Sequence, residues 1–583
     1  MGTGYLIKNA IFFSGDYQEK AVKKYILINE QGIIERISDT DIPVNGETEV
    51  IDAEGKWLVP GFIDSHTHYD AEVIASPGLK ESARHGVTTV IMGSCSVSAI
   101  YNGAEDTSDS FTRVEAIPRS VMLPLLQREK TWQTAAEWKA YVNQLPLGIN
   151  IASFVGHSDL RMKVMGIERS LTKGVRATKE EENRMATMLH EALDEGFLGL
   201  STMDNPWDKM DGKRYWSDKT PSYYASWKER RSLIKILRQR NAILQGAPNL
   251  VTRVSALKYM MVSTGWFRRP LKTTMIAMMD LIGDRLICPA VGLASRIANR
   301  VGNGDFRMQS PPCPFTVYYD GVDSVMFEEF PSGEALRHLA KELDQRNELI
   351  NDPAFRKRFK KDIKNKFVPK VWHKDLSRSL ILEAPEADLV GKNFYQLSEE
   401  RNEHPVDTFL DLIVKYDKQI KWTTTLGNDR PEKYRGLYNF PYNLISFSDA
   451  GAHLNNMAFY NFPLKMIKVV QGFIDQGQPI MDMEKCIWRL TKEQADWFGL
   501  DRGYLAEGKV ADMVLINPRA FHFITETVDS AEMEAFDNFS RLVNRNKEVV
   551  AKVWVAGKVI YADDEFVPDY GTAVKFGQFL PEN

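Results

Sequence analysis

The chain has 583 residues, of which 43% are hydrophobic and 26% charged, values typical of soluble globular proteins rather than of disordered or fibrous chains. Its net charge of -4 gives no sign of the basic surface that nucleic-acid binding usually needs. The 4 cysteines are too few for a disulfide scaffold and favour a reducing compartment. Because there are only 10 histidines, a metal site has few candidates.

No targeting or membrane-spanning segment is predicted. The first residues lack a basic stretch followed by a long apolar core. No window approaches the roughly 18 uninterrupted apolar residues that a spanning helix needs. We therefore expect a cytoplasmic protein with neither a nucleic acid nor a membrane as partner.

Short strand patterns occupy both ends of the chain. Residues 5–13 and 25–37 mix β-branched, aromatic and polar residues around a turn. Residues 510–516 and 549–561 resume this pattern, while the middle of the chain does not. We therefore expect the two ends to pair in one small sheet domain. Its two parts are predicted as residues 1–58 and 501–583.

The middle of the chain, residues 59–500, alternates helical periods with short apolar runs. Thr178 and Glu181 have the spacing of a capping box that opens a helix, and a buried strand follows Gly196. Similar steps from helix to strand are predicted before residues 87–92, 242–245 and 421–425. This α/β alternation predicts a parallel sheet, and the length suits a closed (β/α)8 barrel with insertions.

Residues 303–405 are too long for one strand-helix unit, and we predict an insertion over the barrel mouth. Within it, Phe355, Phe359, Ile363 and Phe367 recur every four residues among many basic residues. A basic amphipathic helix of this kind can contact a membrane or an acidic partner. The commoner meaning, which we favour, is a core-facing stripe with a solvated basic face.

An apolar run ends in Asp64, His66 and His68, spaced by two. Residues two apart on a strand share a face, so the three side chains are predicted to point the same way. Two imidazoles side by side can bind one divalent metal, and Asp64 can orient an imidazole from behind. The alternative is a polar strand end with surface histidines.

Two further strands end in residues that can bind a metal. Cys95 follows residues 87–92, and Asp449 follows residues 444–448. A thiolate at a strand end can be a metal ligand or a nucleophile, although most lone cysteines are small buried thiols. Asp449 can equally be an ordinary helix-capping aspartate.

Together these segments resemble a known family. The sequence runs Pro60-Gly-Phe-Ile-Asp-Ser-His-Thr-His68, His85-Gly-Val-Thr-Thr-Val90, Ser448-Asp-Ala-Gly-Ala-His453 and Gly503-Tyr-Leu-Ala-Glu-Gly-Lys-Val-Ala-Asp-Met-Val514. This pattern resembles the amidohydrolase superfamily. The resemblance narrows to the N-acyl-D-amino-acid deacylases, the D-aminoacylase group, on Gly93-Ser-Cys-Ser96, Phe154-Val-Gly-His-Ser-Asp-Leu-Arg161 and Val164-Met-Gly166. It is weakest over residues 300–420.

The resemblance implies a (β/α)8 barrel joined to a β-sandwich built from both chain ends. It also implies amide hydrolysis with a metal, usually zinc, that is bound by His66 and His68 and ligated or bridged by Cys95. Asp449 is implied to bind the metal and to act as general base. In that role it takes a proton from the attacking water and hands it to the leaving amine.

The sequence departs from the family at two later metal ligands, which are histidines at the ends of the fifth and sixth barrel strands. We place these strands at residues 241–247 and 284–290, which carry Gln245 and the Ile287-Cys288 pair instead. We therefore predict one zinc ion rather than two. Its predicted ligands are His66, His68, Cys95 and Asp449. The residues expected to support these ligands without binding the metal are Asp64, Gln245 and His453.

His157 follows another apolar run, so it is either a substrate-binding group or a structural histidine. Arg161 and Arg296 are candidates to pair with a substrate carboxylate, since a guanidinium binds carboxylate through two parallel bonds. The predicted reaction is deacylation of a small N-acyl substrate, by resemblance an N-acyl-D-amino acid. The alternatives are a hydantoinase-like or dihydropyrimidinase-like hydrolase of cyclic amides, and a non-catalytic scaffold. The sequence is compatible with a homo-oligomer.

Overall fold

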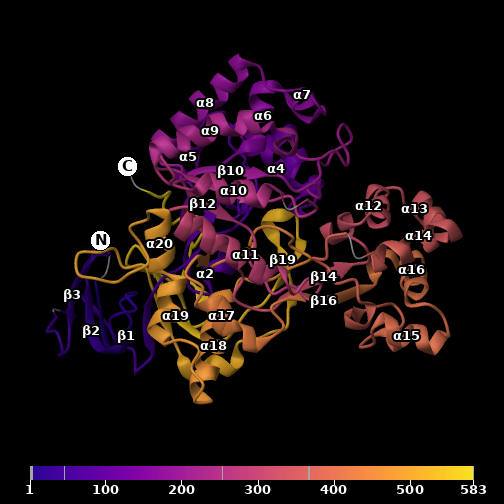
Figure 1. Cartoon of the computed structure of the whole chain (residues 1–583). Helices are drawn as coiled ribbons and strands as arrows, with labels where there is room; N and C mark the ends of the chain where they lie inside the picture. The colour runs from indigo at the N-terminus through magenta and orange to yellow at the C-terminus, as the bar shows by residue number, and fades with distance from the viewer. Residues whose placement is uncertain (1–3, 45, 253, 366–367, 582–583) are drawn as a thin grey trace.

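Both ends of the chain pair in one sheet. The computed structural model describes residues 4–44, 46–252, 254–365 and 368–581 (Figure 1). The strand order is β23-β22-β21-β18-β5-β1-β2-β3, with β4 beside β1. These strands are β1 (Tyr5–Phe12), β2 (Val22–Ile28), β3 (Ile34–Ser38), β4 (Glu49–Asp52), β5 (Trp57–Pro60), β18 (Met513–Ile516), β21 (Val550–Val555), β22 (Lys558–Ala562) and β23 (Glu565–Phe566). The predicted pairing of the two chain ends in one sheet is confirmed.

The centre of this sheet is buried on both faces. β18 runs antiparallel to β5 and places Met513 opposite Pro60. Met513 and Leu515 pack into the cluster beneath β1 and β2, while Val514 and Ile516 pack into the main core. Because side chains alternate along a strand, one short apolar strand joins both cores.

Parallel strands form two further sheets, as the alternation predicted. One has the order β6-β7-β8 and the other β17-β13-β12-β11-β10-β9. Their bounds are β6 (Phe62–Asp64), β7 (Val87–Met92), β8 (Asn150–Ser153), β9 (Val155–Gly156), β10 (Gly199–Met203), β11 (Ile243–Ala247), β12 (Lys272–Met275), β13 (Asp305–Gln309) and β17 (Asn443–Leu444). Only Phe154 separates β8 from β9. The backbone N–H of Ser65, just after β6, donates to the carbonyl of Ser446, just after β17, at 3.0 Å.

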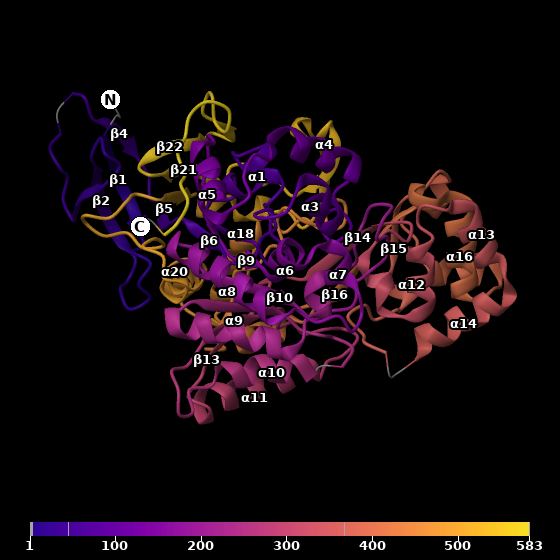
Figure 2. The same cartoon turned by 90° about the horizontal axis from the view of Figure 1, so that it is seen from above.

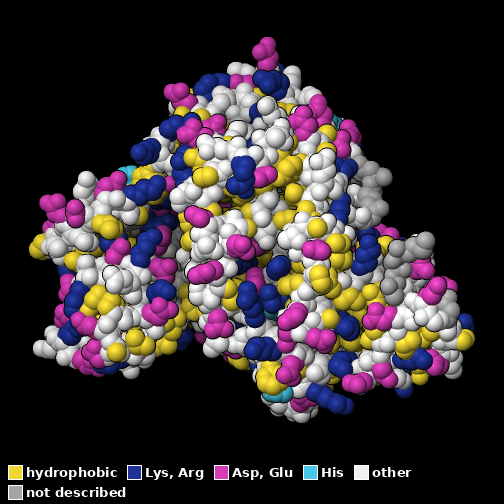
Figure 3. Space-filling model, turned by 180° about the vertical axis from the view of Figure 1, so that it is seen from behind, with side chains coloured by type: hydrophobic (Ala, Val, Ile, Leu, Met, Phe, Trp, Pro, Cys, Tyr) yellow, Lys and Arg dark blue, Asp and Glu magenta, His cyan; other side chains and the backbone are white. Residues whose placement is uncertain are grey.

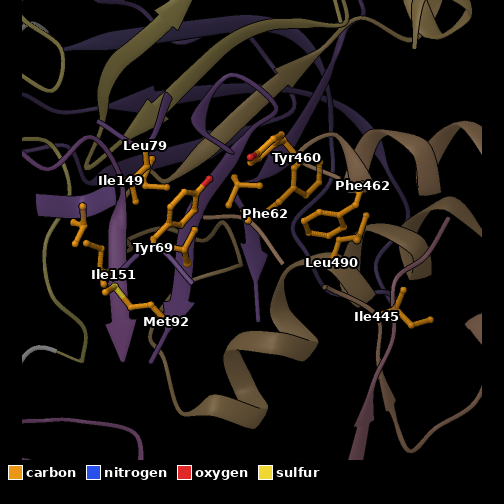
Figure 4. Close-up of a cluster of buried hydrophobic side chains, with 14 of the residues drawn as sticks. Phe62, Tyr69, Leu79, Met92, Ile149, Ile151, Ile445, Tyr460, Phe462 and Leu490 are labelled. Atoms are coloured by element: carbon orange, nitrogen blue, oxygen red, sulfur yellow. The ribbon is translucent and has the colours of Figure 1, made fainter. Parts of the chain in front are cut away.

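Helices cover these parallel strands. They include α1 (Glu72–Ala75), α2 (Lys80–Ala83), α3 (Ala104–Phe111), α4 (Arg119–Glu129), α5 (Ala135–Gln144), α6 (His157–Met165), α7 (Ile167–Leu171), α8 (Lys179–Asp194), α9 (Trp227–Arg240), α10 (Val254–Ser263), α11 (Ile287–Arg296), α17 (Tyr434–Tyr438), α18 (Phe462–Asp475), α19 (Met483–Leu490) and α20 (Lys492–Phe498). The predicted capping box at Thr178 and Glu181 opens α8. Figure 4 shows the core where Phe62 and Tyr69 meet Phe462 and Leu490.

Two strand predictions are wrong. Residues 284–290, predicted as the sixth barrel strand, contain the start of α11, and the strand after β11 is β12. Residues 421–425, predicted to belong to the parallel sheet, lie in β16 (Lys421–Gly427), which pairs antiparallel with β14 (Phe315–Asp320) and β15 (Leu380–Glu383). Short apolar runs fit a buried helix and a strand equally well, which explains the first error.

A lobe with its own hydrophobic cluster stands apart from the parallel strands (Figures 1 and 2). Its helices are α12 (Pro331–His338), α13 (Leu343–Asn351), α14 (Pro353–Lys364), α15 (Phe394–Arg401) and α16 (Pro405–Tyr416). Phe355 and Phe359 on α14 are buried in this cluster and Ile363 packs against it. The favoured prediction of a core-facing stripe is therefore confirmed for these residues, while Phe367 lies outside the described residues. β13 falls within the predicted insertion but belongs to the parallel sheet.

The remaining strands, β19 (Asp529–Met533) and β20 (Phe539–Val543), form a hairpin. Figure 3 shows the face opposite to that of Figure 1, where acidic and basic side chains are intermingled. Within the described part of the chain, no helix combines the length and the apolar character needed to cross a bilayer.

Candidate metal centre

Two histidines enter the site from the segment that follows β6. The backbone N–H of Thr67 donates to the carbonyl of Ile91 at 2.9 Å, and that of His68 donates to the carbonyl of Ala450 at 2.7 Å. The segment is thus held extended between its neighbours, and alternate side chains share one face. His66 and His68 are buried, and their ring centroids lie 5.2 Å apart.

Cys95 and Asp449 complete a cluster with these histidines. The donor atoms of His66, His68 and Cys95 lie within 4.8 Å of one another. Asp449 Oδ1 lies 3.1 Å from His68 Nε2 and 3.7 Å from His66 Nε2. Cys95 and Asp449 both have left-handed backbone conformations, with φ of 53° and 61°. Non-glycine residues rarely adopt this conformation, and it tends to occur at functional sites.

Gln309, at the end of β13, fixes the protonation of the His66 ring. Its Oε1 lies 2.9 Å from His66 Nδ1, and its Nε2 donates to the carbonyl of Ser65 at 3.1 Å. Because the amide nitrogen is committed to Ser65, the oxygen must accept from His66 Nδ1–H. Nε2 of His66 therefore keeps its lone pair and faces Cys95, whose Sγ is 3.5 Å away.

Glu115 takes the corresponding place at His68, with Oε1 3.1 Å from His68 Nδ1. Sequence reasoning missed both Gln309 and Glu115. Gln309 falls within the predicted insertion, although its position at a strand end is the same signal that identifies His66. Glu115 follows α3 in a loop and carries no strand-end signal.

The electrostatics suit a bound cation. Burial, with the neighbouring His68, lowers the pKa of His66 to about 4, so its ring is neutral. Burial also disfavours the charged form of His68, but Glu115 and Asp449 raise its pKa well above the usual value. Burial raises the pKa of the Cys95 thiol to about 11. A nearby cation is what stabilises a buried thiolate, and N and S donors are ligands that zinc prefers.

Asp449 remains ionised in this environment. Burial by itself raises its pKa, but the hydrogen bond and the charge of His68, with the charge of His453, lower it below the usual range. The carboxylate therefore carries a negative charge that can bind a cation.

Asp64 holds the site together through the backbone. Its carboxylate accepts from the backbone N–H groups of His66 and Ser448, both at 3.3 Å, and from the Ser448 hydroxyl. It thereby ties the segment of His66 to the segment of Asp449. The contacts that orient the two imidazoles come from Gln309 and Glu115 instead.

Gln245 lies beside Cys95. Its Oε1 accepts from the backbone N–H of Cys95 at 3.0 Å, and its Nε2 is buried without a hydrogen-bond partner among the described residues. Thr274, its register partner on β12, likewise has a buried hydroxyl without a partner in the described chain. Two polar groups thus stand on the adjacent strands β11 and β12.

The predicted substrate-binding residues lie in two other places. His157 Nε2 is 3.0 Å from Glu229 Oε1, and Arg161 Nη1 is 3.2 Å from Glu229 Oε2, all three side chains being buried. These contacts join α6 to α9. Arg296 is exposed on α11, where its guanidinium lies 5.3 Å from the ring centroid of Phe440.

His453 is close to the cluster. Its backbone N–H donates to the carbonyl of Glu115 at 2.6 Å, and its charge is one of those that lower the Asp449 pKa. Asp208, which sequence reasoning did not identify, also influences the pKa of Cys95. Burial, with the charge of Glu115, raises the pKa of Asp208 to about 7.

The chain is similar in sequence to a known family and to several known proteins. A model of the amidohydrolase family matches residues 49–213. An uncharacterised protein of Mycobacterium tuberculosis (strain ATCC 25618 / H37Rv) is 41% identical over 586 residues, which cover 99% of this chain and 95% of that protein. The N-acyl-D-aspartate deacylase of Alcaligenes xylosoxydans xylosoxydans is 36% identical over 156 residues, 26% of this chain and 28% of that protein.

Solved structures share the fold. An N-acyl-D-glutamate deacylase from Bordetella bronchiseptica, complexed with zinc and a phosphonate inhibitor, has a TM-score of 0.63 at 17% identity and covers 100% of both chains. A D-aminoacylase has a TM-score of 0.61 at 16% identity and covers 99% of both chains.

Proposed function

This chain belongs to the amidohydrolase family, and from that premise we propose that it deacylates a small N-acyl amino acid of D configuration by metal-dependent amide hydrolysis. The observation that carries the proposal is the convergence of His66, His68, Cys95 and Asp449 at one buried point. The 36% identity to an N-acyl-D-aspartate deacylase over 156 residues supports the substrate class.

We propose that the two parallel sheets are arcs of one (β/α)8 barrel over residues 59–500, with a β-sandwich built from residues 1–58 and 501–583. The single residue between β8 and β9 supports continuity at one junction. The parallel bridge between Thr67 and Ala450 supports closure at the other. This arrangement puts the metal ligands at the carboxyl ends of the strands, where barrel enzymes carry their sites.

Zinc fits the donor set of two imidazoles, a thiol and a carboxylate. His66 would bind through Nε2, since Gln309 occupies Nδ1, and Cys95 and Asp449 would supply negative charge. A bound zinc ion supplies Lewis acidity, which lowers the pKa of water and polarises an amide carbonyl.

Asp449 moves the proton. It accepts a proton from the attacking water as the water oxygen bonds to the acyl carbon, and it returns that proton to the amide nitrogen as the C–N bond breaks. The products are a carboxylic acid and a free amine. The unpartnered Nε2 of Gln245 is a donor available to a substrate oxygen.

We propose one metal ion per chain. The strands β11 and β12 present Gln245 and Thr274 where further imidazole ligands are expected, and neither is a usual zinc ligand. A related D-aminoacylase with a binuclear metal centre is described as having one-metal activation and second-metal attenuation, which supports activity with a single ion.

We also propose a cytoplasmic location, which the four free cysteines support. His157, Arg161 and Arg296 remain proposed substrate-binding residues. Glu229 already engages His157 and Arg161 in buried contacts, whereas Arg296 is exposed.

The test is amine release by the zinc-reloaded protein from N-acetyl-D- and N-acetyl-L-amino acids, with a hydantoin as the cyclic-amide alternative. Asp449→Asn keeps the size of the side chain and removes the base, so we expect kcat to fall by about 100-fold or more. Release from the hydantoin alone would favour a cyclic-amide hydrolase. Equal rates for Asp449→Asn and the unaltered protein would show that Asp449 is not the general base.

A further inference from the structure

The helices α10 and α11 and the segments beside them carry an unusual concentration of exposed apolar side chains, here called the α10–α11 surface. Phe267 is 109% exposed, Met261 67% and Leu286 76%. The exposed apolar residues of this surface are Val251, Val254, Leu257, Met261, Trp266, Phe267, Leu286, Leu293, Ile297 and Val301. Figure 2 shows α10 and α11 together along one outer edge of the molecule.

The α10–α11 surface is hollowed as well as apolar. A cavity of about 800 Å³ is lined by Leu257, Met261, Trp266 and Ile297. Scattered exposed hydrophobic residues are normal, but a contiguous apolar patch of this kind marks an interaction site with a protein or a membrane.

The exposed charged residues of the α10–α11 surface all have one sign. Five exposed basic residues lie on it: Lys258, Arg268, Arg269, Arg296 and Arg300. Residues 254–302 are all described and include only Asp280 and Asp284 as acidic residues, neither of them exposed. Within the described residues, none of the five basic side chains forms an ion pair with an acidic one. Because the whole chain has a net charge of -4, the basic character is a local feature of this surface.

We propose that the α10–α11 surface docks the protein on an anionic lipid bilayer. Trp266 and Phe267 enter the headgroup region, where aromatic rings are favoured, and the basic residues contact lipid phosphates. Each lysine or arginine near an anionic leaflet strengthens binding by about fivefold. This proposal departs from our expectation, based on the lack of a predicted spanning segment, that no membrane is a partner, because docking on a bilayer surface needs no spanning helix.

A second copy of the chain fits the α10–α11 surface less well. A two-fold dimer through this patch brings the same surface of both copies together. Arg268, Arg269 and Arg300 of one copy would then meet a surface with the same basic residues and no exposed acidic residue within residues 254–302, which is unfavourable. A bilayer containing acidic lipid supplies both the apolar region and the negative charge. The inference does not depend on the proposed function, since binding to lipid needs no catalysis.

The test is cosedimentation of the full-length protein with phosphatidylcholine vesicles and with vesicles that also contain phosphatidylglycerol. We expect binding to the anionic vesicles, little binding to the neutral ones, and weaker binding at high salt. Arg269→Gln with Arg300→Gln should weaken binding by about 25-fold, the effect of two basic side chains. Met261→Ser with Phe267→Ser should weaken it by about tenfold or more.

The matched control is Tyr395→Ser with Phe523→Ser, which removes aromatic side chains that are each 46% exposed elsewhere on the molecule. This control should bind as the unaltered protein does. Circular dichroism verifies that each variant is folded. Absence of binding to anionic vesicles, or equal binding to both vesicle types, would overturn the proposal. So would sedimentation analysis that shows a dimer which Met261→Ser with Phe267→Ser dissociates, because the surface would then bind a second copy.

Discussion

At the residue scale, the protonation of His66 depends on Gln309. The Gln309 amide contacts two groups. Its Oε1 lies 2.9 Å from Nδ1 of His66, and its Nε2 donates to the carbonyl of Ser65 at 3.1 Å. It leaves Nε2 as the only nitrogen of His66 that can face a cation. Side chains that orient metal-binding imidazoles in this way commonly change metal affinity by about 10- to 100-fold when they are replaced.

Gln309→Leu should therefore weaken zinc binding by about 10- to 100-fold, because His66 can then adopt the other tautomer. Gln309→Glu keeps an acceptor at the same place and should restore most of the affinity. Competition with a chromophoric chelator measures both variants. Equal zinc affinity of Gln309→Leu and the unaltered protein would show that Gln309 does not orient His66.

Part of this cluster could be predicted from the sequence alone. His66, His68, Cys95 and Asp449 each follow an apolar strand pattern, so their common location follows from the rule that parallel strands end at one edge. Glu115 could not be predicted, since its place depends on how the loop after α3 folds back.

At the element scale, α14 shows that the apolar stripe of an amphipathic helix faces the core and its basic face is exposed. Phe355 and Phe359 are buried, with 1% and 0% exposure, while Lys357 and Arg358 between them are exposed. The four-residue spacing predicted this burial correctly. The strand predicted at residues 284–290 failed, because an apolar run interrupted by Pro289 carries no period that separates a helix from a strand.

Phe359→Ala should lower the free energy of unfolding by about 3 to 5 kcal/mol, because it leaves a cavity in the cluster of the lobe. Lys357→Ala, on the same helix, should change it by less than about 0.5 kcal/mol. Urea unfolding measures both values. A large loss with Lys357→Ala, or none with Phe359→Ala, would show that the basic face of α14 is the one in contact.

At the scale of the whole molecule, two ion pairs join the C-terminal part of the chain to the helices α1 and α2. Arg545 Nη2 lies 2.6 Å from Glu81 Oε1, and Arg541 Nη1 lies 2.7 Å from Glu72 Oε1. The shared sheet could be anticipated, since both ends carry strand patterns. These ion pairs could not, because charges more than 460 residues apart in sequence carry no local signal.

The Glu81 ion pair should make stability depend on pH. Burial by itself raises the pKa of Glu81, but hydrogen bonds from Arg545 and the charges of Arg84 and Arg541 lower it to about 2 from an ordinary value of 4.5. A carboxyl whose pKa is lowered by folding stabilises the protein above its unfolded pKa. That stabilisation is lost as the pH falls from about 4.5 to about 2.

Glu81→Gln should therefore cost about 3 kcal/mol of unfolding free energy at pH 7, and less as the pH falls below about 4.5. Glu54→Gln, at an exposed pair with Lys56, should cost less than about 1 kcal/mol at any pH. Denaturant unfolding at several pH values measures the difference. A cost for Glu81→Gln that stays constant from neutral to acid pH would contradict the assigned pKa.

Amine release during a zinc titration of the metal-free protein tests the proposed chemistry most directly. With an N-acetyl-D-amino acid as substrate, one-metal hydrolysis at His66, His68, Cys95 and Asp449 predicts that activity rises with added zinc and reaches its plateau at one equivalent per chain. Activity that needs a second equivalent, or no amine release at any zinc concentration, would contradict it.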